Sequence, residues 1–216
     1  EDSKNMWYQG RGLWTHSYLA RHFDHSDSLQ VARRTRDFLL THGRDQNGWW
    51  VAELAADGTV VKPATQCGYE SLFVAEGLTA YAAAADDDES LDIAIESLTR
   101  VAALYRDPTR IVEEGYVPLN YPGMRVLGGH MVLILTLTQM LELRPDDATL
   151  QALAQEIVGG ITGKFWNDKY GLMNEALTCE MTRPDDANED FCYLGHAIET
   201  LWMTMAEALR LGDRTL

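Results

Sequence analysis

The sequence has no long apolar run, little positive charge and few cysteines. No apolar stretch approaches the ~20 residues that a membrane-spanning helix needs, so we expect no membrane insertion. Among 216 residues, 18 are Lys or Arg and 33 are Asp or Glu, which gives a formal net charge of −15. This balance argues against nucleic acid, whose phosphates attract clustered cations, and against anionic membrane surfaces. We therefore expect no nucleic-acid partner and no membrane partner.

The sequence also lacks the motifs of common cofactor and metal sites. The phosphate loop, the dinucleotide-binding fingerprint and the HExxH zinc motif are all absent, so we expect neither a cofactor nor a metal. The three cysteines, Cys67, Cys179 and Cys192, are odd in number and lack zinc-type spacing. Since no signal peptide is visible either, they predict reduced thiols in a cytoplasmic protein.

Helical periodicity is what the sequence has in abundance. Apolar residues make up 46% of the chain, which is enough for a sizeable core. Their three- and four-residue spacing predicts helices over residues 7–22, 28–42, 68–85, 89–106, 126–143, 147–165 and 190–211. Residues 45–61 and 167–183 combine a Gly-containing turn with mixed apolar residues, and we interpret both as short β-hairpins. Asp147 and residues 188–190 are predicted to cap the helices that follow them.

Four of the predicted helices begin with similar chemistry, which indicates a weak internal repeat. A polar or Gly-rich entry precedes an aromatic and apolar body in "YQGRGLW", "QCGYESLF", "LGGHMVLI" and "LGHAIETLW". These entries recur about every 60 residues, with one more amphipathic helix between them. That rhythm is typical of stacked helical hairpins, whose inner helices are apolar nearly all round. It predicts an all-α fold, a toroid of helical hairpins with short β-hairpins between helices.

The polar residues at these entries are the candidate site. If all inner helices point the same way, six side chains converge on one rim: Arg11, Tyr69, Glu70, His130, His196 and Glu199. The backbone N–H groups at helix N-termini favour anionic or oxygen-rich groups there. Aromatic rings stack on the C–H faces of a sugar, while polar groups bind its hydroxyls. The pattern therefore favours a neutral polyol such as a sugar as the ligand.

Each charged candidate also has a purely structural interpretation. Arg11 can hold sugar oxygens or a developing enediolate, or it can simply pair with a carboxylate. His196 can act as general base or acid with Glu199 one turn on, or it can be a hydrogen-bonded core residue. The same two interpretations apply to His130.

The remaining candidates are aromatic residues and further carboxylates. Trp7 and Tyr69 are platforms for a sugar ring or packing residues. Glu70 and Glu199 could be paired carboxylates for glycoside cleavage, which only their separation would decide. Glu53 and Glu175 recur in the two predicted hairpins, where they either line the same crater or are surface charges.

The four helix entries together resemble the N-acylglucosamine 2-epimerase family. "KNMWYQGRGLW" is similar to the early motif of that family, and "GYESLFVAEGLTAYA" is similar to its next inner helix. "GGHMVLILTLTQML" is similar to the helix that carries one active-site histidine, and "YLGHAIETLW" to the GH-x-x-E segment that carries another. The order and spacing of these motifs match over nearly the whole chain.

The resemblance implies a partial (α/α)6 barrel and a sugar 2-epimerase or aldose–ketose isomerase, acting on N-acylglucosamine, mannose or related sugars. It implies that Arg11 and His130 bind the substrate. It implies that His196 is one of two catalytic histidines, with Glu199 as the glutamate one turn after it. A proton beside the carbonyl of the opened sugar is removed, and the enediolate regains it at C2 (epimerisation) or at C1 (isomerisation).

The chain is shorter than the family pattern. Family members are nearly twice as long, so we expect residues 1–216 to be a single, incomplete barrel domain that lacks both ends. No histidine follows His196, and the second catalytic base is therefore expected beyond Leu216. We expect this fragment alone to have little or no epimerase activity.

Two other functions remain open from the sequence. A glycoside hydrolase or lyase on a similar (α/α) toroid would use two carboxylates as acid and base. A non-catalytic half-toroid would pair with another chain to cover its exposed wall, and a homodimer is one form of that pairing. The half-toroid hypothesis predicts a large apolar face.

Overall fold

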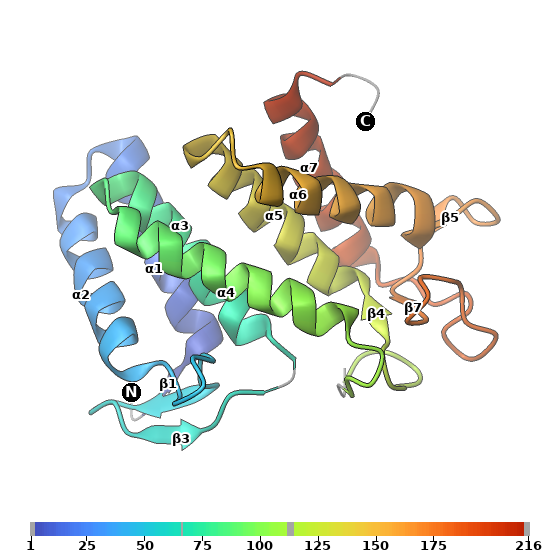
Figure 1. Cartoon of the computed structure of the whole chain (residues 1–216), viewed down its shortest axis with the longest axis horizontal. Coiled ribbons are helices and arrows are strands. Elements are labelled where there is room, and N and C mark those ends of the chain that lie inside the picture. Colours follow the sequence, from blue (N-terminus) through green and yellow to red (C-terminus); the bar gives the residue numbers. More distant parts are fainter. Residues whose placement is uncertain (1–2, 66, 112–114, 214–216) are drawn as a thin grey trace. The chain divides into compact units, whose positions relative to one another are not determined.

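The structure is a computed structural model that describes residues 3–65, 67–111 and 115–213, most of which are helical (Figure 1). The helices are α1 (Met6–Phe23), α2 (Ser26–His42), α3 (Tyr69–Ala85), α4 (Asp88–Arg106), α5 (Leu127–Leu143), α6 (Ala148–Gly160) and α7 (Leu194–Leu211), and a π-helical turn, η1 (Ile161–Phe165), follows α6. All seven predicted helices are thus confirmed. The chain divides into two compact units, Glu1–Val101 and Ala102–Leu216, and each is described by itself.

The predicted start of the last helix is wrong. Helix α7 begins at Leu194 and not at residue 190. The preceding segment is not helical because its backbone is used elsewhere: the Glu175 N–H donates to the Phe191 carbonyl oxygen at 2.9 Å. Asn188 is not a helix cap, since its side-chain amide donates to the Leu119 carbonyl oxygen at 2.8 Å. Residues 188–193 therefore form a tether that leads into α7.

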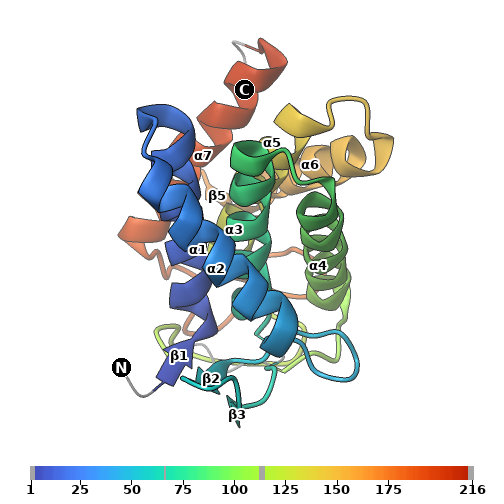
Figure 2. The same ribbon diagram turned by 90° about the vertical axis from the view of Figure 1, so that its left-hand side faces the viewer.

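The first unit is built around the crossing of α1 and α3. Helix α1 packs against both α3 and α2 (Figures 1 and 2). A Cβ atom at Gly10 would lie 2.3 Å from the Phe73 carbonyl oxygen, and one at Gly77 would lie 2.5 Å from the Gly10 carbonyl oxygen. Glycine at both positions therefore lets the two backbones approach this closely. The crossing brings Arg11, the residue after Gly10, over the ring of Phe73.

A small antiparallel sheet fixes the start of α1. Its strands are β1 (Ser3–Asn5), β2 (Glu53–Ala55) and β3 (Val60–Lys62), in that order across the sheet. The β2–β3 pair confirms the first predicted hairpin, and Gly58 in its turn has a φ of +92°. Strand β1 leads directly into α1 (Figure 2), and the Asn5 side chain caps the helix by accepting from the Trp7 N–H at 3.0 Å.

Helix α5 is the centre of the second unit. It is buried on nearly all sides and packs against α6 and α7 (Figure 1). Strand β4 (Arg125–Val126) pairs with β7 (Ala176–Leu177), and β5 (Trp166–Asn167) pairs with β6 (Leu172–Met173). The β5–β6 pair confirms the second predicted hairpin. The β4–β7 pair matters for function because it holds residue 175 beside the first turn of α5.

Helix α7 is buried on one face only. Its other face carries six exposed apolar side chains: Leu194, Ile198, Leu201, Trp202, Met205 and Leu209. A contiguous apolar face of this kind is typical of a surface that another element or chain covers. In the part of the chain that the structure describes, none of the helices combines the length and hydropathy that a membrane span requires.

Candidate functional site

A histidine–carboxylate pair lies at the start of α7. His196 Nδ1 lies 2.9 Å from Glu175 Oε1. The Glu175 side chain is fully buried, whereas that of His196 is 21% exposed. Because a carboxylate oxygen can only accept, Nδ1 carries the hydrogen, and the neutral ring has its lone pair on Nε2. The pair thus has the form of a general base whose tautomer and orientation are fixed by an acid.

The first turn of α5 holds the Glu175 carboxylate in place. Oε1 also accepts from the Gly128 N–H at 3.3 Å and from the Tyr116 hydroxyl at 3.2 Å. The Glu175 carbonyl accepts from the Leu127 N–H at 2.8 Å. The free N–H groups at the N-terminal end of α5 thus fix the position of this buried side chain. Among the described residues, Oε2 has no hydrogen-bond partner.

Aromatic rings form the walls around His196. Its ring meets the rings of Tyr116 and Tyr193 edge to face, with centroid separations of 5.4 Å and 4.6 Å. The two tyrosine rings lie 5.3 Å apart, and Tyr193 is 44% exposed. A partly open aromatic wall beside an imidazole can stack on the C–H face of a sugar and present its carbon to the base.

A second cluster lies in the first unit, where α1 crosses α3. The Arg11 guanidinium lies 4.6 Å from the centroid of the Phe73 ring and 5.9 Å from that of Trp7. Trp7 stacks on Phe73 at 4.6 Å and lies 5.3 Å from Tyr69. Arg11 and Trp7 are exposed, whereas Tyr69 is buried. A guanidinium above aromatic faces keeps its donors directed outward, which suits the oxygens of a sugar or an oxyanion.

Two buried carboxyl groups of α3 belong to this unit. Glu70 Oε1 accepts from the Thr65 N–H at 2.8 Å and from the Thr65 hydroxyl at 2.7 Å, so it anchors the loop that precedes α3. Burial raises the pKa of Glu76 to about 7, against the opposing effect of the Arg11 charge. A carboxyl group that is close to half protonated near neutral pH therefore lies within electrostatic reach of Arg11.

His130 occupies a different environment from His196. It is buried in α5, its Nδ1 donates to the Val126 carbonyl oxygen at 3.1 Å, and its ring meets Phe165 edge to face at 4.8 Å. It lines a pocket formed by α4, α5 and α6, and none of Glu175, Tyr116 and His196 lines that pocket. Burial chiefly lowers the pKa of His130 to about 4. Its role as a substrate ligand stays a prediction.

The structure thus groups the predicted residues in part. Trp7, Arg11 and Tyr69 lie together in the first unit, with Glu70 turned to the loop before α3. Glu199 is exposed on α7, one turn after His196. The convergence of all entries on one rim involves both units and stays a prediction. No group of three or more potential metal ligands occurs among the described residues.

Two residues of the histidine cluster escaped the sequence interpretation. For Glu175, one of two hairpin glutamates, the sequence leaves both a crater position and a surface charge open, and its burial beside His196 excludes the surface charge. Tyr116 lies in the long connection before β4, where no periodic pattern marks it. The one signal in the sequence was the recurrence of a glutamate in both hairpins.

Paired helices with short strands between them define an all-α protein of the (α/α) type. The family model of N-acylglucosamine 2-epimerase (GlcNAc 2-epimerase) matches residues 1–215. The chain therefore belongs to the N-acylglucosamine 2-epimerase family. In sequence, no curated protein matches it.

Solved structures of sugar epimerases and isomerases share the fold. The chain is similar to a sugar epimerase from a ruminal bacterium (16% identity, TM-score 0.80), to cellobiose 2-epimerase from Bacillus thermoamylovorans B4167 (17%, 0.80) and to a D-mannose isomerase (16%, 0.75). The matches cover 100%, 99% and 100% of this chain but 57%, 58% and 56% of those chains. At such identities the likeness shows the fold, and the predicted partial (α/α)6 barrel is confirmed.

Proposed function

We propose that the chain carries the proton-transfer group of a sugar 2-epimerase or aldose–ketose isomerase, and that this group is His196. The observation that supports the proposal best is the 2.9 Å hydrogen bond between His196 Nδ1 and the buried Glu175 carboxylate. This bond directs the lone pair to Nε2 and stabilises the imidazolium that forms when Nε2 takes a proton. The family assignment supplies the substrate class, which is a sugar with a carbonyl group in its open form.

The proposed reaction needs one proton and no net change in oxidation state. His196 Nε2 removes the proton from C2 of the open-chain aldose, and the electron pair of the C–H bond forms the C1–C2 double bond of an enediolate. The negative charge moves to the carbonyl oxygen, where cationic donors such as those of Arg11 stabilise it. Return of the proton to the other face of C2 gives the 2-epimer. Transfer of the proton to C1, together with passage of the C2 hydroxyl proton to the O1 oxyanion, gives the ketose.

The remaining predicted residues have supporting roles in this proposal. Trp7 and Tyr69 provide a stacking surface for a sugar ring, and Glu70 supports that surface through the loop before α3. Glu199 lies on the same side of α7 as His196 and is a second carboxylate for substrate hydroxyls. N-acylglucosamine, mannose and related sugars are the proposed substrates.

A glycoside hydrolase is the main competing function, and the carboxylates argue against it. Hydrolysis needs two carboxyl groups on either side of one glycosidic bond. Glu175 Oε1 is instead bound to an imidazole, and Glu70 Oε1 is bound to Thr65. Glu175 and Glu70 thus position other groups, and Glu199, the other acid of the predicted Glu70–Glu199 pair, is exposed on α7.

One experiment with cellobiose separates the two functions. The folded chain is incubated with cellobiose in D2O, in parallel with N-acetylmannosamine and mannose, and 1H NMR follows each sugar. A proton-transfer enzyme replaces the C2 proton of the reducing sugar by deuterium, and a single base suffices for that exchange. A hydrolase releases glucose from cellobiose with the C2 proton intact. Glucose release without exchange in any sugar would overturn the proposal.

A further inference from the structure

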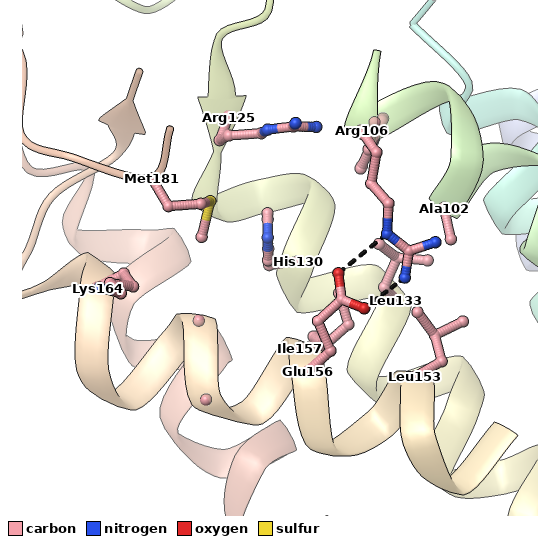
Figure 3. A pocket seen from close by; sticks show the side chains of 13 residues that line it. Ala102, Arg106, Arg125, His130, Leu133, Leu153, Glu156, Ile157, Lys164 and Met181 are labelled. Carbon is pink, nitrogen blue, oxygen red and sulfur yellow. Dashed lines mark hydrogen bonds and ion pairs between the residues drawn. The ribbon is translucent and has the colours of Figure 1, made fainter. Parts of the chain in front are cut away.

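The pocket between α4, α5 and α6 is unusually cationic for so acidic a chain. It has a volume of about 330 Å³, within the range of small-molecule sites. Three of its lining residues are cations, Arg106, Arg125 and Lys164, and one is an acid, Glu156 (Figure 3). Since the whole chain has a net charge of −15, a local excess of two positive charges is not a consequence of composition.

Arg125 is a buried cation in this pocket that lacks an anionic partner among the described residues. The residue is 9% exposed, and neither a hydrogen bond nor an ion pair of its side chain occurs among the described residues. Figure 3 shows its guanidinium extending over the pocket toward Arg106. Burial chiefly, and the charges of Arg110 and Arg106 as well, lower the pKa of Arg125. A buried guanidinium costs free energy unless an anion pairs with it.

The acids near Arg125 are already engaged with other groups. Glu156 binds Arg106 through both carboxylate oxygens, and its Oε1 lies 3.0 Å from Arg106 Nε. Asp107 accepts from the Thr109 N–H at 2.8 Å and from the Thr109 hydroxyl at 2.7 Å. Glu180, whose charge also interacts with that of Arg125, is hydrogen-bonded to Cys179. The Arg125 guanidinium therefore has donors left for a ligand from outside the chain.

His130 adds an acceptor to this set of donors. Its Nδ1 donates to the Val126 carbonyl oxygen, so the lone pair of the neutral ring lies on Nε2. The ring faces Gly160, where an added Cβ atom would lie 3.8 Å from Nε2. A ligand with anionic oxygens for Arg125 and a hydroxyl group for His130 Nε2 would satisfy both. Leu133, Leu153 and Ile157 line the apolar remainder of the pocket.

We propose that this pocket is a second binding site, distinct from the His196 cluster, for a small hydroxylated organic oxyanion such as a sugar phosphate or a sugar acid. Arg125 binds the phosphate or carboxylate by paired N–H donors, and Lys164 adds charge at the rim. The Arg106–Glu156 pair closes one wall. The site requires no part of the proposed sugar chemistry, so it stands or falls independently of that function.

Binding is measured by isothermal titration calorimetry with four probes: glucose 6-phosphate, gluconate, inorganic phosphate and neutral glucose. We expect at least one of the two hydroxylated anions to bind, inorganic phosphate to bind more weakly, and any heat from glucose to be unaffected by changes in the pocket. A preference for glucose 6-phosphate identifies a phosphate site, and a preference for gluconate identifies a carboxylate site. Absence of binding by all three anions would overturn the proposal.

Three variants with different expected effects on anion affinity test whether the anion binds in this pocket. Arg125→Met should weaken binding of the preferred anion at least about tenfold, because it removes the bidentate charged donor. Glu156→Gln should tighten it, because it removes the one acid and releases Arg106. Lys169→Met removes an exposed cation outside the pocket and should leave the affinity unchanged.

A further variant keeps the test decisive if Arg125→Met does not fold. Lys164→Met alters an exposed pocket side chain and should weaken binding by a smaller factor. Equal affinities in wild type, Glu156→Gln and Lys164→Met would place the anion elsewhere on the surface and contradict the proposal.

Discussion

The entries of α5 and α7 carry one histidine each, in similar sequence surroundings. The two histidines differ in their hydrogen-bond partners and in their burial. His196 donates from Nδ1 to a buried carboxylate that comes from a distant hairpin, and its ring is partly exposed between two tyrosines. His130 donates from Nδ1 to the carbonyl of its own helix four residues earlier and lies buried against Phe165.

The two histidines differ in chemical behaviour because they differ in burial and in the group that accepts the hydrogen bond from Nδ1. An acid on Nδ1 stabilises the charged ring, which is what a proton carrier requires. Burial lowers the pKa of His130 against the opposing effect of the Val126 carbonyl on Nδ1, so the ring is neutral and acts as a fixed acceptor. A histidine in the first turn of an inner helix is therefore suited to proton transfer in one place and to recognition in the other.

The largest expected effect concerns the two helices themselves. Leu133 on α5 is 1% exposed, whereas Leu209 on α7 is 81% exposed. Leu133→Ala should lower the free energy of unfolding by about 2–5 kcal/mol, because it leaves a cavity in the core. Leu209→Ala should change it by less than about 0.5 kcal/mol. Urea denaturation measures both, and equal losses would mean that another chain covers α7.

The next effect concerns the charge of His130. With a folded pKa of about 4 against 6.5 in the unfolded chain, the unfolded state binds the proton first. The contribution to stability is therefore full above pH 6.5 and is lost as the pH falls toward 4, by about 3 kcal/mol in total. Urea unfolding between pH 7 and pH 4 should show this loss in wild type and a shallower one in His130→Gln. Identical slopes would contradict the buried, neutral state of His130.

A smaller effect is expected at the carboxylate behind His196. Glu175→Gln keeps the shape of the side chain but removes the charge that stabilises the imidazolium. The rate of C2 proton exchange should fall about 10- to 100-fold, as it does when a group that orients a functional histidine is altered. Glu189→Gln, at an exposed position in the same unit, is the matched control and should leave the rate unchanged. A rate unaffected by Glu175→Gln would remove Glu175 from the mechanism.

The smallest effect concerns how the helices begin. Asp147 caps the outer helix α6 by accepting from the N–H groups of Thr149 and Leu150 at 2.9 Å and 3.0 Å. The entries of α5 and α7 have no side-chain cap, and the first turn of α5 instead receives Glu175. Asp147→Ala should therefore destabilise the protein by about 1 kcal/mol in thermal or urea unfolding. Exchange activity should be unchanged in this variant, and a loss would show that α6 contributes to the site.

Much of the fold could be predicted because an amphipathic helix requires a periodic spacing of apolar residues that is visible in the local sequence. Apolar spacing located all seven helices, and a Gly-containing turn located both hairpins. The start of α7 was misplaced because the tether before it is held by long-range bonds, such as those of Asn188 to residue 119, that no local pattern reveals.

The site was predictable to a lesser degree. The helix entries singled out Arg11, His130 and His196, since polar residues are rare at the ends of apolar helices. The sequence could not distinguish the two histidines, because the acid that does so comes from a hairpin 21 residues before His196. Pairing between β4 and β7 brings that acid to α5, and such pairing is a tertiary property.

The most direct test of the account compares two histidine variants in one assay. C2 proton exchange of the best sugar is measured in D2O for wild type, His196→Asn and His130→Asn, each shown to be folded by circular dichroism. The account predicts that His196→Asn lowers the exchange rate about 10²- to 10⁴-fold, the usual contribution of a general base, while His130→Asn, which removes a binding group and not the base, lowers it by a clearly smaller factor. Exchange that survives in His196→Asn, or that is lost equally in both variants, would contradict the assignment of His196 as the proton carrier.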